Sequence, residues 1–176
     1  KSGALLQRLK LDSEEDMVLE QSLLLETLKS FCPNITYFEI SNIEFSSQLL
    51  DLIGNLQKLQ FLTLWCEWCT DNIISEGGQV LQFAKILPLT LEYLDISYSC
   101  FSIYIDILLN NCNAPLKKLL IDKLDNEKQA KALIEFCIRK RTLNYVGIDA
   151  YLDDEFKKDL EGYVTAVPYE RIVVNC

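Results

Sequence analysis

The feature that most constrains the fold of this chain is a short apolar pattern that recurs along its whole length. An apolar residue, two further residues, a second apolar residue, one further residue and a third apolar residue follow one another, as in Leu91, Leu94 and Ile96. The pattern starts at Leu6, Ile35, Leu59, Leu91, Leu116, Leu143 and Tyr169, at intervals of 24 to 32 residues. Alternation at the end of each triplet is typical of a strand with one buried face. A repeat of this length predicts stacked strand-and-helix units.

The segments between the triplets have a helical period instead. Leu24, Thr27, Leu28, Phe31 and Cys32 stand at i, i+3, i+4, i+7 and i+8 of one apolar stripe, and the segment 130–138 has the same spacing. Further helices are expected near residues 47–56, 78–87, 103–112 and 153–165. Proline stands just before four of the triplets, at positions 33, 88, 115 and 168. Because proline ends a helix, each unit is predicted to run from strand to loop to helix and back.

Units of this kind cannot bury their own apolar faces, so they must stack on one another. We therefore expect an α/β leucine-rich-repeat solenoid, or horseshoe, with about seven parallel strands on its concave face and helices on its convex face. No internal boundary is visible, and residues 1–176 are interpreted as a single domain. The start at Lys1 and an apolar last strand suggest a fragment of a longer chain. Whether that last strand is capped in the full-length protein is left open.

The segment FCPNITYFEIS, residues 31–41, resembles the cysteine-containing leucine-rich repeat, in which a helix ends in Cys-Pro before the strand. The chain as a whole is similar to the large fungal families of F-box-like leucine-rich-repeat proteins. This resemblance implies recruitment of a substrate to a Skp-cullin-F-box ubiquitin ligase. No F-box helix trio precedes the first triplet. The resemblance therefore implies the substrate-binding part, which reaches a Skp-type adaptor only through an F-box outside these residues.

The charge and the missing histidine exclude several function classes. The formal net charge is −9, from 17 basic and 26 acidic residues, so nucleic acid and anionic membranes are not expected as partners. No apolar run is long enough to suggest a membrane span. The chain has no histidine, which removes the commonest general base and metal ligand. With no phosphate-binding loop, nucleophile elbow or metal motif either, we expect no enzyme activity, no cofactor and no metal.

Seven cysteines are spread through the chain. An odd number without a secretory signal indicates reduced thiols in the cytoplasm or nucleus. Cys66 and Cys69 form a CxxC pair between the two tryptophans. A zinc site would need further ligands that the chain does not supply, so buried repeat cysteines are the favoured interpretation. Redox chemistry and an exposed reactive thiol are the alternatives.

Residues that alternate with the apolar positions should face away from the helices and line the concave surface. Four of the seven positions before the second apolar residue are aromatic, and carboxylates lie beside them. The predicted partner-binding residues are Tyr37, Glu39, Phe61, Thr63, Trp65, Tyr93, Asp95, Lys118, Asp122, Tyr145 and Asp149. Aromatic anchors and acids of this kind favour a protein or peptide partner with basic patches. The alternative is that aromatic residues are there for strand propensity alone.

The longest repeat contains the segment 65–78, so a loop is predicted to project from the sheet there, with Trp68 as a second binding candidate. The leading hypothesis is a non-enzymatic, protein-binding leucine-rich-repeat domain that recognises substrates for an F-box-type ubiquitin-ligase adaptor. A free-standing scaffold or inhibitor, similar to ribonuclease inhibitor, is the alternative. A thiol-dependent catalyst using Cys66 and Cys69 is a third. The sequence names neither the partner nor the oligomeric state.

Overall fold

The computed structural model describes residues 2–12, 18–67, 73–148 and 154–167. Strands and helices alternate through these residues. The strands are β1 (Arg8–Asp12), β2 (Tyr37–Glu44), β3 (Phe61–Glu67), β4 (Tyr93–Asp95), β5 (Lys118–Ile121), β6 (Tyr145–Ile148) and β7 (Thr165–Val167). The α-helices are α1 (Val18–Phe31), α2 (Ser47–Asn55), α3 (Ile73–Ile86), α4 (Ile105–Asn111), α5 (Glu127–Lys140) and α6 (Asp154–Glu161). Two short 3-10 helices, η1 (Ser2–Leu5) and η2 (Cys100–Tyr104), complete the described elements.

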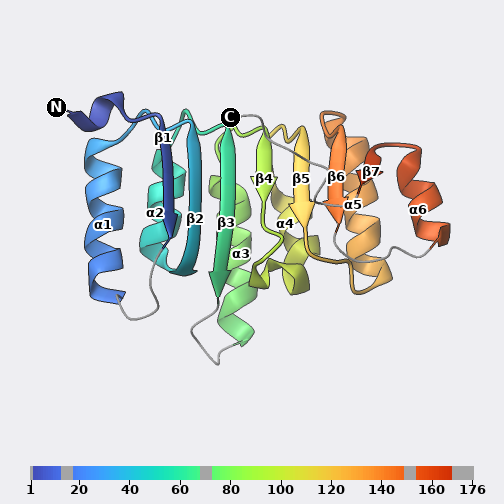
Figure 1. Ribbon diagram of the computed structural model, residues 1–176. Coiled ribbons are helices and arrows are strands. Elements are labelled where there is room, and N and C mark those ends of the chain that lie inside the picture. The colour runs from blue at the N-terminus through green and yellow to red at the C-terminus, as the bar shows by residue number, and fades with distance from the viewer. Residues whose placement is uncertain (1, 13–17, 68–72, 149–153, 168–176) are drawn as a thin grey trace.

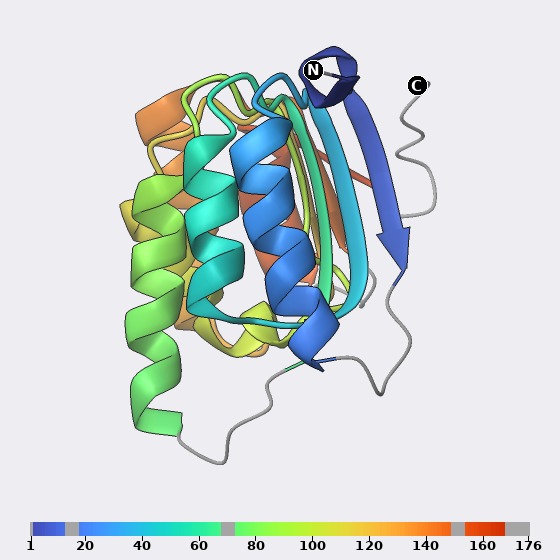
Figure 2. The same cartoon turned by 90° about the vertical axis from the view of Figure 1, so that its left-hand side faces the viewer.

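The strands form one parallel sheet in the order of the chain, from β1 to β7. Figure 1 shows the sheet in front, with α2 to α5 behind it. Figure 2, turned by 90°, separates a helix layer from a strand layer. The predicted α/β class, with seven parallel strands that alternate with helices, is therefore confirmed for the described residues.

The sheet face away from the helices is called here the open face. It carries the side chains of Arg8, Lys10, Tyr37, Glu39, Phe61, Thr63, Tyr93, Asp95, Lys118, Leu120 and Tyr145, which alternate with core residues along their strands. The covered face carries the apolar triplets.

The core lies between the sheet and the helices. The second apolar position of five triplets has no exposed surface, and these residues sit side by side across the sheet: Phe38, Leu62, Leu94, Leu119 and Val146. Phe45, Phe83 and Phe101 pack edge-on and tilted against one another below β2 to β4, with ring centroids 4.9 to 5.7 Å apart. Burial of each such side chain contributes about 1.5–3 kcal/mol to folding. The triplets thus fix which strand face is inward.

Helix ends use both proline and local capping. Helices α1, α3 and α4 end one or more residues before Pro33, Pro88 and Pro115, as predicted. Helix α5 has no proline between it and β6. It ends at Lys140 and is capped by Arg141, whose φ of 54° is left-handed and whose N–H donates to the Cys137 carbonyl. At its start, the Asn126 side chain accepts a hydrogen bond from the Gln129 N–H. Sequence spacing alone did not distinguish these two ways of ending a helix.

The C-terminal repeat differs from its prediction. The triplet that starts at Tyr169 lies outside the described residues, whereas β7 lies at Thr165–Val167 and pairs with β6. Helix α6 therefore ends at Glu161 instead of near residue 165. Leu160 and Val164 are buried, and the Val164 N–H closes the turn on the Leu160 carbonyl. Thr165 and Val167 are β-branched residues that favour a strand.

Candidate functional site

The strand register arranges the open face in two rows that run across the sheet. The first row contains Arg8, Tyr37, Phe61, Tyr93, Lys118 and Tyr145. The second contains Lys10, Glu39, Thr63, Asp95, Leu120 and Gly147. Eight of the predicted binding residues fall in these rows, so residues up to 108 positions apart, from Tyr37 to Tyr145, share one surface.

The aromatic side chains of the first row touch one another. The ring centroids of Tyr37 and Phe61 are 6.3 Å apart, and those of Phe61 and Tyr93 are 5.9 Å apart. Cations lie over two rings of the first row. The Arg8 guanidinium is 4.9 Å from the Tyr37 ring centroid, and the Lys118 ammonium is 5.9 Å from that of Tyr145. Three rings therefore form a continuous aromatic strip between β2 and β4.

Exposure varies along the rows more than the sequence predicted. Tyr145 is 43% exposed and Phe61 half-buried, whereas Tyr93 is only 6% exposed. Thr63 and Asp95, which were also expected to face solvent, are 8% and 7% exposed. These three residues lie on β3 and β4, in the middle of the sheet. The prediction of an evenly exposed surface was wrong at these positions.

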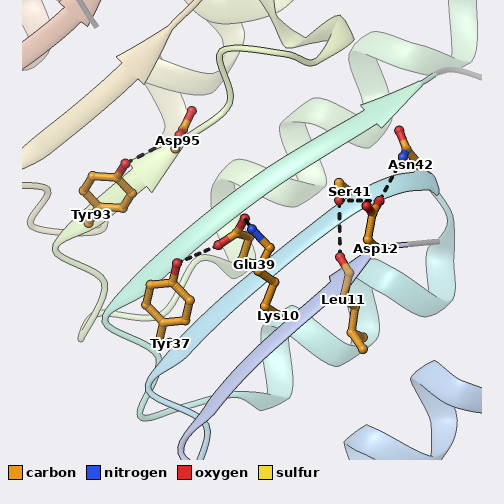
Figure 3. Close-up of polar contacts among 9 residues, drawn as sticks. All are labelled: Lys10, Leu11, Asp12, Tyr37, Glu39, Ser41, Asn42, Tyr93 and Asp95. Atoms are coloured by element: carbon orange, nitrogen blue, oxygen red, sulfur yellow. Dashed lines mark hydrogen bonds and ion pairs between the residues drawn. The ribbon is translucent and has the colours of Figure 1, made fainter. Parts of the chain in front are cut away.

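Glu39 belongs to a complete polar network on the open face (Figure 3). Its carboxylate lies 2.6 Å from the Lys10 ammonium and accepts a 2.7 Å hydrogen bond from the Tyr37 hydroxyl. Burial on its own would raise the pKa of this carboxyl, but the hydrogen bonds from Lys10 and Tyr37 outweigh it and hold the pKa below its usual value. Glu39 is therefore a satisfied, charged group.

Asp95, like Glu39, lies two residues after a tyrosine and accepts hydrogen bonds, but it has no ion pair among the described residues. Its Oδ1 accepts hydrogen bonds from the Ser97 hydroxyl at 2.7 Å and the Ser97 N–H at 3.1 Å, and its Oδ2 lies 3.5 Å from the Tyr93 hydroxyl. No basic side chain of the described residues forms an ion pair with it. Burial raises the pKa of the Asp95 carboxyl, the hydrogen bonds from Ser97 and Tyr93 oppose this, and the charge of Glu39 adds to the rise.

A second aromatic group lies where β3 and β4 end. Trp65 is 37% exposed, and its ring meets that of Tyr98 edge-on with centroids 5.0 Å apart. Sequence reasoning identified Trp65 but missed Tyr98, because Tyr98 follows its strand and lies outside the repeating pattern. An aromatic residue just after a strand is the signal that could have indicated it. Trp65 and Tyr98 extend the aromatic surface toward the carboxyl ends of the strands.

The end of β2 carries a bulge that the sequence analysis did not predict. Ile40 pairs with Leu64 and Ile43 with Cys66, so Ser41 and Asn42 together lie opposite Trp65. Asn42 has a φ of 55°, a conformation that asparagine tolerates better than most residues. The side chains of Ser41 and Asn42 both donate to the Asp12 carboxylate at 2.9 Å (Figure 3). This polar cluster fixes the edge of the sheet.

The remaining predicted residues lie outside the two rows or outside the described residues. Asp122 is half-buried just after β5, while Trp68 and Asp149 lie outside the described residues. Cys66 is 2% exposed, and its CxxC partner Cys69 is likewise outside them. Burial raises the pKa of the Cys112 thiol and raises that of Cys137 to about 11, so these two thiols are poor nucleophiles.

No three His, Cys, Asp or Glu side chains in the described parts of the chain gather closely enough to hold a metal ion. None of the helices in those parts has the length and apolar character needed to cross a bilayer.

Comparisons with known proteins inform the fold alone. No family model matches the chain, and no curated protein matches it. A crystal structure of a Bacteroides fragilis protein, determined by a structural genomics consortium, is similar with a TM-score of 0.57 and 18% sequence identity. The match covers 78% of this chain and 41% of that one, so this chain spans less than half of the Bacteroides protein. At this identity the likeness shows that the chain shares an α/β fold with that protein.

Proposed function

We propose that this domain is a non-enzymatic, leucine-rich-repeat interaction domain that binds a protein or peptide on its open face. The observation that carries the proposal is the continuous aromatic strip of Tyr37, Phe61 and Tyr93, on the sheet face away from the helices. Trp65 and Tyr98 extend it. Such rings supply large contact area at little cost in conformational entropy and are enriched at binding hot spots.

The charge of the chain indicates the expected charge of the partner. The chain carries a net charge of −9, and carboxylates flank the aromatic strip at Glu39 and Asp95. A protein with a net negative charge attracts basic partners, accelerates their encounter and repels acidic ones. A basic protein or peptide therefore fits this face best.

The resemblance of residues 31–41 to the cysteine-containing repeat supports a wider role. In that role the domain recognises substrates for an F-box-type ubiquitin-ligase adaptor, in a reducing compartment, and meets a Skp-type adaptor only through an F-box elsewhere in the protein. A free-standing, ribonuclease-inhibitor-like scaffold is the second candidate, favoured by the acidity and by the buried free thiols of Cys32, Cys112 and Cys137. An F-box in the same polypeptide would favour the first role over the second.

The test is a pull-down from a native cell lysate at low and moderate salt. A variant with Phe61, Trp65 and Tyr145 changed to serine removes accessible rings and leaves the buried Tyr93 in place. The matched control is Ile138→Ser, which removes a 45% exposed apolar residue from helix α5. We expect a partner that the triple variant loses, the control keeps and salt weakens. Identical partners for all three proteins would contradict the proposal.

A further inference from the structure

Asp95 is an unusual residue for the middle of a sheet. Only 7% of it is exposed, and Oδ1 takes both hydrogen bonds from Ser97. Oδ2 has one contact, with the Tyr93 hydroxyl at 3.5 Å, the outer limit for a hydrogen bond. A buried carboxylate with one oxygen so weakly satisfied and with no cation is costly to maintain.

The described residues contain one other buried carboxylate, and it is paired. Asp106 of α4 is 6% exposed and lies 2.6 Å from the Lys128 ammonium of α5. In the helix layer, the buried aspartate is therefore neutralised by a lysine of the same chain. On the open face, no lysine or arginine of the described residues forms an ion pair with Asp95.

The surroundings of Asp95 suit a cationic side chain. Phe61 and Tyr93, whose rings are 5.9 Å apart, lie in the neighbouring row, where the apolar stem of a lysine or arginine can pack and its head can meet an aromatic ring. Thr63 separates Asp95 from Glu39 in the second row, so the two carboxylates lie about 10 Å apart across two strand spacings. Glu39 thus adds to the negative potential at Asp95.

Among the described residues, none of the charged groups on the strands beside Asp95 forms an ion pair with it. On β2, Glu39 already forms an ion pair with Lys10 of β1. On β5, Lys118 directs its ammonium to the Tyr145 ring of β6, away from β4. On β4 itself, Tyr93 supplies a hydroxyl and no charge.

Resting on the proposed function of the open face, we propose that Asp95 is the anchor for a lysine or arginine side chain of the partner, which packs beside Phe61 and Tyr93 and pairs with Oδ2. The anchor explains why the chain keeps a buried carboxylate at a cost in stability. It also gives the partner a defined chemistry, since one cationic side chain must enter the middle of the open face.

Small probes test the anchor without the partner. The Ser97 N–H donates to Asp95, so its amide resonance in a ¹H–¹⁵N spectrum reports on the carboxylate. N-acetyl-lysine amide and N-acetyl-arginine amide would be titrated at neutral pH against N-acetyl-norleucine amide and N-acetyl-citrulline amide, which lack the charge. We expect the cationic probes to shift this resonance and the neutral ones to leave it unchanged. The stronger of the two cationic probes identifies the side chain.

Two variants make the result specific. In Asp95→Asn the affinity for the cationic probe should fall about tenfold or more, as expected when a charge-assisted contact is lost. Asp106→Asn removes the paired buried carboxylate of the helix layer and should leave the affinity unchanged. In the unmodified protein, acidification that protonates Asp95 should abolish the response, which needs no variant to fold. Equal shifts from the neutral probes, or an undiminished response in Asp95→Asn, would overturn the anchor.

The outcome also separates the anchor from the proposed function. If the ring variant loses its partner but the cationic probes fail, the face binds proteins and the anchor is wrong. If the probes bind at Asp95 but the ring variant keeps every partner, the anchor exists and the proposed interaction face is wrong.

Discussion

Strands β2 and β4 carry the same local arrangement with opposite electrostatic outcomes. In each, a tyrosine precedes an acid by two residues on the open face, as Tyr37 with Glu39 and Tyr93 with Asp95 (Figure 3). Beside β2, Lys10 supplies a cation at 2.6 Å, and the Tyr37 hydroxyl approaches to 2.7 Å. Beside β4 there is no such cation in the described residues, and the Tyr93 hydroxyl stays at 3.5 Å. The neighbouring strand therefore decides whether the carboxylate has a cation beside it.

The largest expected effect tests whether the core residues of β2 and β4 stabilise the fold equally. Phe38 and Leu94 are fully buried under the two tyrosine–acid pairs. Changing either to alanine should lower the free energy of unfolding by about 2–5 kcal/mol, because each leaves a cavity in the core. Tyr145→Ala, which removes a 43% exposed ring of the first row, should cost about 1 kcal/mol or less. Denaturant melts would measure all three, and a large loss for Tyr145→Ala would mean that the faces are wrongly assigned.

A smaller loss is expected from Tyr37→Phe. This variant removes the 2.7 Å hydrogen bond to Glu39 and keeps the ring that contacts Phe61. The expected loss of stability is about 1 kcal/mol, typical of a hydrogen bond within a folded protein. The pKa of Glu39 should rise at the same time, because the charged form loses a donor. A variant that melts like the unmodified protein would show that the β2 network is not held by this contact.

The two acids should respond to neutralisation with opposite signs. Since the folded pKa of Asp95 is raised, its contribution to stability is fully present below the unfolded pKa and is lost as pH rises through the folded pKa. Since the folded pKa of Glu39 is lowered, its contribution is present above the unfolded pKa and is lost as pH falls through the folded pKa. At neutral pH, Asp95→Asn should therefore stabilise the free domain and Glu39→Gln destabilise it.

Chemical denaturation at neutral and acidic pH would check these signs. The gain from Asp95→Asn should shrink in acid, where the unmodified residue already holds its proton. A variant that is less stable at neutral pH would mean that the Asp95 carboxylate supports the fold.

The smallest effect is expected from a variant that gives Glu39 of β2 the same setting as Asp95 of β4, without a neighbouring cation. Lys10→Met keeps most of the side-chain length and removes the cation from Glu39. The pKa of Glu39 should then rise toward or above its usual value, as at Asp95, because burial is no longer outweighed. Carbon-detected NMR titration of the glutamate carboxyls would show it. An unchanged Glu39 pKa would assign the lowered value to another cause.

Particular residues show what the sequence could predict here. The triplets identified the inward positions, and Phe38, Leu62, Leu94 and Leu119 are all fully buried as expected. The same alternation predicted which residues share the open face, but not how deeply each is covered. Tyr93 and Tyr145 hold equivalent positions in their triplets and differ from 6% to 43% in exposure. Tyr93 lies between Phe61 and Lys118, whereas Tyr145 lies between Lys118 and Thr165, and periodicity along one strand does not encode these neighbours.

Other features depend on contacts between distant residues or on single conformations. Lys10 and Glu39 are 29 residues apart, and no local pattern predicts their ion pair. The bulge at Asn42 depends on one left-handed residue. Strand β7 has only three residues and lacks the apolar triplet that revealed the others, so its position was predicted too late in the chain. The repeat therefore predicts the sheet, and the electrostatics of the open face require the assembled structure.

Among the described residues, the open face holds one carboxylate with a cation beside it, Glu39, and one without, Asp95. A single NMR titration of the unmodified domain, following the side-chain carboxyl carbons of Glu39 and Asp95, tests this difference most directly. We expect a Glu39 pKa below its ordinary value and an Asp95 pKa above its own, in the same sample. A lowered Asp95 pKa would mean that a cation of the chain already serves it, and the proposed anchor would have no vacancy for a partner.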